Sequence, residues 1–380
     1  RLTGRFARTS VAGERVDAFV PAPLPPRLEA EALVELHEPL RGAEAALARL
    51  ELAGEMIPSL DWFIYAFVRK EALLSSEIEG TQATLVDVLA WEQIEQAGDS
   101  LVEDLEEVTN YVAAVRYAFE QLGSRKVAPV SVRLLHDCHR ILMQGVRGSS
   151  RQPGELRRSQ NWLGGSRPGN AVFVPPPPEQ VPELLGALEH YIHGRDELAP
   201  LLRVGLVHVQ FETIHPYLDG NGRLGRMLIA LLLHHWGLLE SPLLYLSLYL
   251  KQHQAAYYDW LSAVRAEGDW AGWLRFFLEG VHEIAEDGTR RARSLYAQVS
   301  EDRVHLLGAR GATVTAIQLF ERLPEMPVVT MPAVTRLLSV TKPTAGKAIE
   351  VLTRAGILAE VGARKRDRLY RYDRYLKLLE

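Results

Sequence analysis

Apolar residues recur at spacings of three and four over most of the chain, which predicts a largely helical protein. A first helical region extends from about residue 27 to residue 122. Further helices are expected over residues 131–143, 180–193, 201–213 and 223–236, with several more up to about residue 307. The residues before this region end in prolines, at 21, 23, 25 and 26, so we expect an extended strap there.

Two regions depart from the helical pattern. Short β-like runs flank a turn cluster between Asn161 and Val174, which predicts a small β-hairpin ended by the prolines at 175–178. Near the C-terminus, three helices are expected over 313–323, 331–338 and 341–352, followed by strands over 357–361 and 369–372. The two strands flank the basic residues Arg364, Lys365, Arg366 and Arg368. This order is typical of a winged helix-turn-helix.

The candidate chemistry is concentrated in residues 215–226, HPYLDGNGRLGR, which lie between two apolar helices. The segment is therefore a tight loop leading into a helix N-terminus, where unpaired N–H groups and the helix dipole favour phosphate. Gly220 and Gly222 let the backbone approach an anion closely. Arg223 and Arg226 are three residues apart, so both can reach one polyphosphate from the same helix face.

Two more side chains of this segment suit phosphate chemistry. Asp219 is a hard oxygen ligand for Mg²⁺, and His215 is a base that can be neutral at pH 7. Each residue alone would fit an ordinary turn between helices, but their combination within one short segment predicts a phosphate-transfer site. The sequence has no Walker-type loop, and His136 and His139 lack a matching third metal ligand, so we interpret them as ordinary helix residues.

The segment resembles the core motif of the Fic family, H-P-F-x-[DE]-G-N-G-R-x-x-R, with Tyr217 in place of the usual Phe. The resemblance extends to residues 154–157 and to the hairpin at 161–174, which looks like the family's target-docking flap. It implies an all-α Fic fold with a small flap. It also implies an enzyme that transfers AMP from Mg·ATP to a Ser, Thr or Tyr hydroxyl of a target protein.

The same resemblance implies the roles of individual residues. His215 would be the base, Asp219 the Mg²⁺ ligand, and Arg226 the ligand of the γ-phosphate. The remaining nucleotide-binding positions would be Gly220, Asn221, Gly222 and Arg223, of which the last three form the anion hole.

Residues 75–80, SSEIEG, resemble the family's inhibitory motif [ST]-x-x-x-E-[GN], with Ser75, Glu79 and Gly80 at its fixed positions. Glu79 falls in the last turn of a helix, where a carboxylate opposes the macrodipole and requires solvent or a cationic partner. In the N-terminally inhibited subclass that partner is the second motif arginine, here Arg226. The pair would admit ATP only in an unproductive pose, although an exposed acidic helix end is the simpler alternative.

The length of 380 residues suggests two or three domains. We predict an N-terminal helical region over 1–124, a catalytic core over 125–290, and a linker helix with the winged helix over 291–380. The 47% apolar and 24% charged residues are typical of a soluble globular protein, and the net charge of -5 gives no global reason to expect nucleic acid or membrane binding.

The remaining sequence features bear on the protein's setting. One cysteine, Cys138, excludes an intramolecular disulfide and favours a reducing, cytoplasmic setting. The chain opens without an apolar signal region and without Met, so we expect no signal peptide and further residues ahead of Arg1. The apolar run at 227–233 is too short to cross a bilayer.

Two alternative functions stay open at this point. With Glu79 orienting a water molecule, the same site could remove AMP from a modified protein. The chain could instead be a DNA-binding regulator, because Lys342, Lys347 and Arg354 lie on the third C-terminal helix beside the basic wing. Self-modification and homodimer formation are also open.

Overall fold

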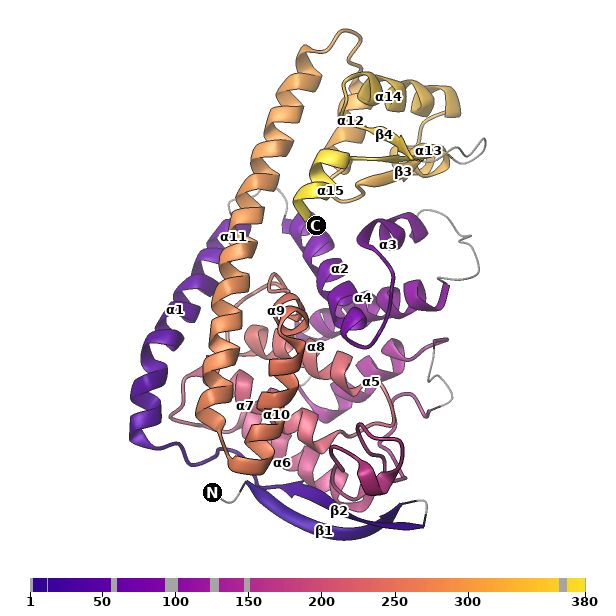
Figure 1. Ribbon diagram of the computed structural model, residues 1–380. Coiled ribbons are helices and arrows are strands. Elements are labelled where there is room, and N and C mark those ends of the chain that lie inside the picture. Colours follow the sequence, from indigo (N-terminus) through magenta and orange to yellow (C-terminus); the bar gives the residue numbers. More distant parts are fainter. Residues whose placement is uncertain are drawn as a thin grey trace.

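The computed structural model describes residues 3–11, 13–55, 60–92, 102–123, 130–146, 151–361 and 368–379. It shows a mostly helical molecule with two small sheets, as the hydrophobic pattern predicted (Figure 1). The long helices α1 (Ala30–Glu55) and α11 (Trp270–Gly308) pack along each other on one side. Within the described ranges, none of the helices combines the length and the apolar character needed to cross a membrane.

The centre of the molecule is formed by α7 (Pro200–Ile214) and α8 (Asn221–His235), which pack against each other. Nearly every residue of α7 is buried, as expected for a helix surrounded by others. The helices around this pair are α2 (Leu60–Ile78), α3 (Leu85–Trp91), α4 (Val102–Gly123), α5 (Val132–Leu142), α6 (Val181–His193), α9 (Ser247–Gln252) and α10 (Gln254–Glu267). The candidate phosphate segment is thus the connection between the two central helices.

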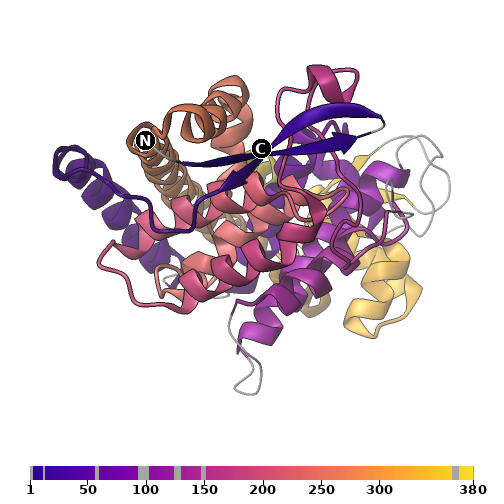
Figure 2. The same ribbon diagram turned by 90° about the horizontal axis from the view of Figure 1, so that it is seen from below.

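The strap predicted for the first residues is wrong in one respect. Residues 4–21 form an antiparallel hairpin of β1 (Gly4–Val11) and β2 (Glu14–Pro21), in which Phe6 pairs with Phe19. The prolines that suggested a strap begin only at Pro21, so they end the second strand and leave the ladder between the two strands intact. Figure 2 shows the hairpin lying across one end of the helical core.

The hairpin predicted over 161–174 is reduced to a single antiparallel bridge between Leu163 and Phe173. The turn between them holds the short 3-10 helix Pro168–Asn170, and the left-handed glycines 164 and 165 interrupt a regular ladder. The loop is completed by the N-terminal hairpin, because Phe19 N–H donates to Val174 O at 2.9 Å and Glu14 accepts from the backbone of Gly169 at 3.0 Å.

The C-terminal module contains α12 (Val314–Arg322), α13 (Met331–Leu338) and α14 (Lys342–Arg354). Its sheet has the order β3 (Val328–Thr330), β5 (Leu369–Arg371), β4 (Ala359–Val361), and α15 (Asp373–Leu379) follows. These helices and the small sheet are consistent with a winged helix, although β3 and α15 were not expected from the sequence. α11 is continuous through residue 290, so the predicted domain boundary there stays a prediction.

The basic surface of this module is only partly described. The wing residues Arg364, Lys365 and Arg366 lie outside the described residues. Two described basic residues pair with acids, Arg354 with Glu350 at 2.9 Å and Arg368 with Glu360 at 3.3 Å. Lys342 and Lys347 are exposed on α14, and DNA binding through this helix stays a prediction.

Candidate active site

The loop between α7 and α8 is fixed by its own backbone geometry. α7 ends at His215, which adopts the left-handed conformation with φ 48°, and α8 begins after Gly220 with φ 73°. The Asn221 side chain bonds the backbone of Tyr217 twice, accepting from its N–H and donating to its carbonyl, each at 2.9 Å. The Asn221 side chain therefore fixes the shape of the loop. The backbone N–H of Asn221 lies in the first turn of α8, where such groups have no partner within the helix.

The backbone at His215 is held by Arg157, a buried residue of the 154–157 segment. The Arg157 guanidinium donates to His215 O at 2.8 Å, and its backbone N–H donates to Pro216 O at 3.0 Å. Burial, assisted by the positive charge of Arg157, lowers the pKa of His215 to about 4. The imidazole is therefore neutral at pH 7 and able to accept a proton.

Tyr217, the departure from the family motif, has a partner for its hydroxyl. The hydroxyl lies 2.9 Å from Nδ1 of His136, and the ring stacks on His139 with centroids 3.9 Å apart. His139 accepts from Gly154 N–H at Nδ1, at 2.8 Å, so its Nε2–H donates to Asp219 O at 3.0 Å. The two histidines are therefore not ordinary helix residues, because they position the motif loop.

Asp219 directs its carboxylate to the helix start and to solvent. One oxygen accepts from Gly220 N–H at 2.7 Å, and the other lies 3.8 Å from the Arg151 guanidinium. The side chain is 38% exposed, so a cation can approach it. Within the residues that the structure describes, no group of three His, Cys, Asp or Glu side chains forms a metal site made by protein alone. A single carboxylate suits Mg²⁺ that is held mainly by phosphates and water.

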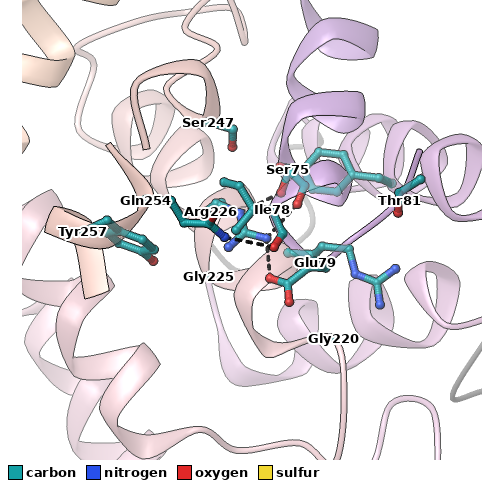
Figure 3. A network of polar contacts seen from close by, with 12 residues as sticks. Ser75, Ile78, Glu79, Thr81, Gly220, Gly225, Arg226, Ser247, Gln254 and Tyr257 are labelled. Atoms are coloured by element: carbon teal, nitrogen blue, oxygen red, sulfur yellow. Dashed lines mark hydrogen bonds and ion pairs between the residues drawn. The ribbon is translucent and has the colours of Figure 1, made fainter. Parts of the chain in front are cut away.

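Arg226 lies in contact with the end of α2, as Figure 3 shows. Its Nε donates to Ser75 Oγ at 2.8 Å, and a terminal nitrogen donates to Ser75 O at 2.9 Å and to Glu79 Oε1 at 2.7 Å. The contact between Glu79 and Arg226 that the sequence predicted is thus present. The Arg226 side chain is only 2% exposed, whereas that of Glu79 is 39% exposed.

The Glu79 carboxylate lies directly against the first turn of α8. A Cβ atom added at Gly222 would collide with Oε1 of Glu79, so glycine is required for this approach. The first N–H groups of α8, from Asn221 to Arg223, cannot bond within the helix and favour an anion at this place. Burial opposes ionisation of Glu79, but the charge of Arg226, its hydrogen bond and the charge of Arg223 together outweigh burial, so the pKa of Glu79 lies below its ordinary value.

The last turn of α2 is anchored by further polar contacts. Lys251 donates to Glu77 at 2.6 Å, and Gln254 donates to Ile78 O at 3.2 Å. Gly80 follows with φ 103°, which ends the helix. Both carboxylates of this turn therefore have the cationic partners that the helix dipole requires, Glu77 through Lys251 and Glu79 through Arg226.

Arg223, the other motif arginine, faces a different acid. One of its terminal nitrogens lies 3.2 Å from Glu107 of α4, and both side chains are only 4% exposed. The sequence did not point to Glu107, Arg157 or His139 as site residues. For Glu107 a signal existed, since it shares a helix face with the buried residues Tyr111, Ala114 and Ala118, where a charge requires a partner.

Two family models match this chain. The Fic/DOC family N-terminal region matches residues 37–120, and the Fic/DOC family domain matches residues 129–233. The chain belongs to the Fic/DOC family. The family domain thus ends within α8 and includes the whole motif segment.

Among curated relatives, the chain is similar to the protein adenylyltransferase Fic of Aedes aegypti, at 27% identity over 231 residues. That match covers 60% of this chain and 41% of the relative. The protein of the same name from Drosophila grimshawi is 27% identical over 228 residues, covering 59% of this chain and 42% of the relative. The chain thus aligns with less than half the length of these two relatives.

Solved structures share the fold. A Fic family protein from Desulfovibrio desulfuricans G20 superposes with a TM-score of 0.58 at 21% identity, over 92% of this chain and 98% of that one. Fic-1 of C. elegans superposes with a TM-score of 0.51 at 22% identity, over 71% of this chain and 75% of that one. The mostly helical Fic fold with small sheets is therefore confirmed.

Proposed function

We propose that this protein transfers AMP from Mg·ATP to a Ser, Thr or Tyr hydroxyl of a target protein, and that residues 75–80 inhibit it. The observation that carries the proposal is the position of the Glu79 carboxylate, which Arg226 binds at the start of α8. An acidic group at this place supports an anion site, because the helix N-terminus and the arginine favour any anion. The similarity to proteins named protein adenylyltransferase supports AMP as the transferred group.

The described residues fit ATP and a magnesium ion. The first turn of α8, Arg223 and Arg226 would hold the phosphates, and the open carboxylate of Asp219 would hold Mg²⁺. When bound, the ion would neutralise charge on the phosphates that leave.

The reaction follows from these positions. Neutral His215 would take the proton of the target hydroxyl, whose oxygen forms a bond to the α-phosphorus while the bond to the β-phosphate oxygen breaks. AMP stays on the protein and pyrophosphate leaves. Most of the acceleration would come from alignment and charge stabilisation, because phosphoryl transfer needs little covalent assistance.

Inhibition would act through Arg226. While Glu79 and Ser75 occupy its guanidinium, the γ-phosphate lacks that ligand, and ATP would bind with its α-phosphorus out of line with the hydroxyl. The partial exposure of Glu79 supports a contact that can open without disrupting the core.

The test compares two labels of ATP in the Glu79→Gly variant. Label on the α-phosphate should enter protein and label on the γ-phosphate should not, with pyrophosphate released in equal amount to the protein-bound AMP. The assay should include the chain itself as a substrate, since its own exposed hydroxyls need no identified partner. Incorporation of γ-label would contradict the proposal and indicate a kinase-like reaction.

A second candidate function is removal of AMP at the same site. It is favoured by the partial exposure of Glu79, whose carboxylate lies against the first turn of α8 and is open to water. Glu79 could take a proton from a water molecule whose oxygen attacks the phosphorus, releasing AMP and the free hydroxyl. A substrate already carrying AMP would then lose it with the wild type and keep it with Glu79→Gly.

A further inference from the structure

Arg223 is enclosed by the protein to an unusual degree for a phosphate ligand. Its side chain is 4% exposed, and Glu107 at 3.2 Å is its nearest acid. Other neighbours are Met143 Sδ at 3.7 Å and Asp219 Oδ1 at 4.0 Å. A guanidinium so removed from water requires a compensating charge, and Glu107 supplies it from the second turn of α4.

One side of this arginine is still open to a ligand. Within the described residues, neither the buried Nε of Arg223 nor its Nη1 has a hydrogen-bond partner, because the contact of Nη1 with Glu107 is an ion pair without hydrogen-bond geometry. A buried N–H without a partner costs about 1–3 kcal/mol, so an acceptor that reaches it is favoured. Glu107 at a terminal nitrogen and a phosphate oxygen at another nitrogen would use different parts of the same planar fork.

Glu107 also contacts the turn that follows the inhibitory segment. Thr81 donates its hydroxyl to Glu107 Oε2 at 3.2 Å, and Thr81 N–H donates to Ser76 O at 3.2 Å. The same carboxylate therefore contacts both the motif arginine and the segment behind Gly80. Since Glu107 is buried in a helix, these contacts can persist when the exposed Glu79 leaves Arg226.

We infer that Glu107 is a positioning residue for AMP transfer. It holds the Arg223 guanidinium in the orientation that phosphate requires and compensates its charge before ATP arrives, with Thr81 fixing the carboxylate. The inference rests on the proposed function for its kinetic consequence. Its effect on ATP binding is independent of catalysis.

A role in stability alone makes a different prediction from a positioning role. In the Glu79→Gly background, Glu107→Gln keeps the shape of the side chain and removes its charge. Loss of a negative charge beside the phosphates should tighten ATP binding by roughly threefold to tenfold. Loss of orientation should lower kcat for AMP transfer by about tenfold or more. If Glu107 were only structural, its substitution would lower the Tm but would not raise ATP affinity while lowering kcat.

The experiment measures ATP affinity by calorimetry and kcat by α-label incorporation, with Glu106→Gln as the matched control on the same helix. Glu107→Asp should recover part of the lost rate, because it keeps the charge with a shorter reach. Unchanged ATP affinity and kcat in folded Glu107→Gln would overturn the inference. If that variant does not fold, the same two measurements on Glu107→Asp decide, and a kcat equal to that of the parent overturns it.

The outcomes also separate this inference from the proposed function. If the Glu79→Gly parent incorporates no label, the proposed function fails. The affinity measurement then still tests Glu107, because tighter ATP binding in Glu107→Gln requires only that Arg223 face the nucleotide. Equal or weaker ATP binding in that variant would count against Glu107 even in an inactive parent.

Discussion

The two motif arginines lie three residues apart on α8, yet their acidic partners differ in almost every physical respect. Arg226 binds Glu79, which follows the last turn of α2 and is 39% exposed, whereas Arg223 faces Glu107, which is 4% exposed in the second turn of α4. Breaking a pair that is buried on both sides costs about 3–5 kcal/mol. Release of the partly exposed Glu79 costs less, because its carboxylate can return to water while the buried Arg226 keeps its bonds to Ser75. One contact is therefore suited to opening during regulation, and the other to remaining closed.

This difference explains how one face of α8 can carry both a contact that persists, Arg223 with Glu107, and a contact that can open, Arg226 with Glu79. A carboxylate at a helix end can move with a short segment, and Gly80 provides a flexible position next to Glu79. A carboxylate inside a packed helix can move only with the whole element. The predictions that follow test the comparison, beginning with the largest effect.

The largest effect is expected from His215→Ala in the Glu79→Gly background. Removing the base should lower AMP transfer by about two to four orders of magnitude. ATP affinity should stay near that of the parent, because His215 acts on the hydroxyl rather than on the nucleotide. Rates of α-label incorporation and calorimetric ATP binding measure the two quantities. Transfer near the parental rate would show that another group is the base.

The next effect distinguishes the releasable pair directly. Glu79→Gly should raise transfer at least tenfold, because a misalignment of about an ångström can cost on the order of a hundredfold in rate. Adding Arg226→Ala should cancel the gain, since the released ligand is then missing. Label incorporation into the chain and into candidate targets provides the measurement. If Glu79→Gly leaves transfer unchanged, residues 75–80 are a structural helix end.

The pH dependence tests the environment of the base. Burial lowers the pKa of His215 to about 4, so the neutral form that accepts a proton persists as the pH falls. Initial rates of Glu79→Gly should therefore be level from pH 8 to pH 6 and decline only near pH 4. A decline centred on about pH 6.5 would indicate an ordinary, solvated histidine.

The same acidification should leave the wild type inhibited. The charge of Arg226 keeps the pKa of Glu79 below its ordinary value, so the carboxylate stays ionised and paired down to about pH 5. Transfer by the wild type should thus show no activation between pH 8 and pH 5, with circular dichroism as the control for folding. Activation by mild acid would mean that protonation releases Glu79.

Stability should separate the two carboxylates as well. Glu107→Gln is expected to lower the free energy of unfolding by about 3 kcal/mol, because it leaves the buried Arg223 uncompensated. Glu79→Gln should lower it by less, since water can replace a partly exposed carboxylate and Arg226 keeps its bonds to Ser75. Urea unfolding of both variants measures the difference. Equal losses would remove the physical basis for the comparison.

The sequence predicted one of these two pairs and missed the other, for a physical reason. Glu79 belongs to a short motif whose helix-end position creates a local demand for a cation, so Arg226 could be named in advance. Glu107 meets Arg223 only through the packing of α4 near α8. Local pattern shows that a charge occupies a core position, but it cannot show which distant residue compensates it.

The fold divides in the same way. Most helices followed from periodicity, because each buries one apolar face. The first hairpin was missed because a cluster of prolines outweighed the alternation of apolar and polar residues that precedes it. The loop at 161–174 was predicted as a regular hairpin because its glycines and proline were interpreted only as a turn. In both segments the final form depends on their contact with each other, between Phe19 and Val174.

The smallest effect concerns the residue that departs from the family motif. Tyr217→Phe keeps the ring that stacks on His139 and removes the hydroxyl that lies 2.9 Å from His136. A buried hydrogen bond of this kind contributes about 1 kcal/mol, so the Tm should fall by a few degrees. His136→Ala should also lower the stability, because it removes the same bond. The double variant should therefore lose less stability than the sum of the two single losses. Thermal unfolding of the four proteins measures this coupling. Strictly additive losses would mean that the hydroxyl and the imidazole do not interact, and that Tyr217 stands in the motif for its ring alone.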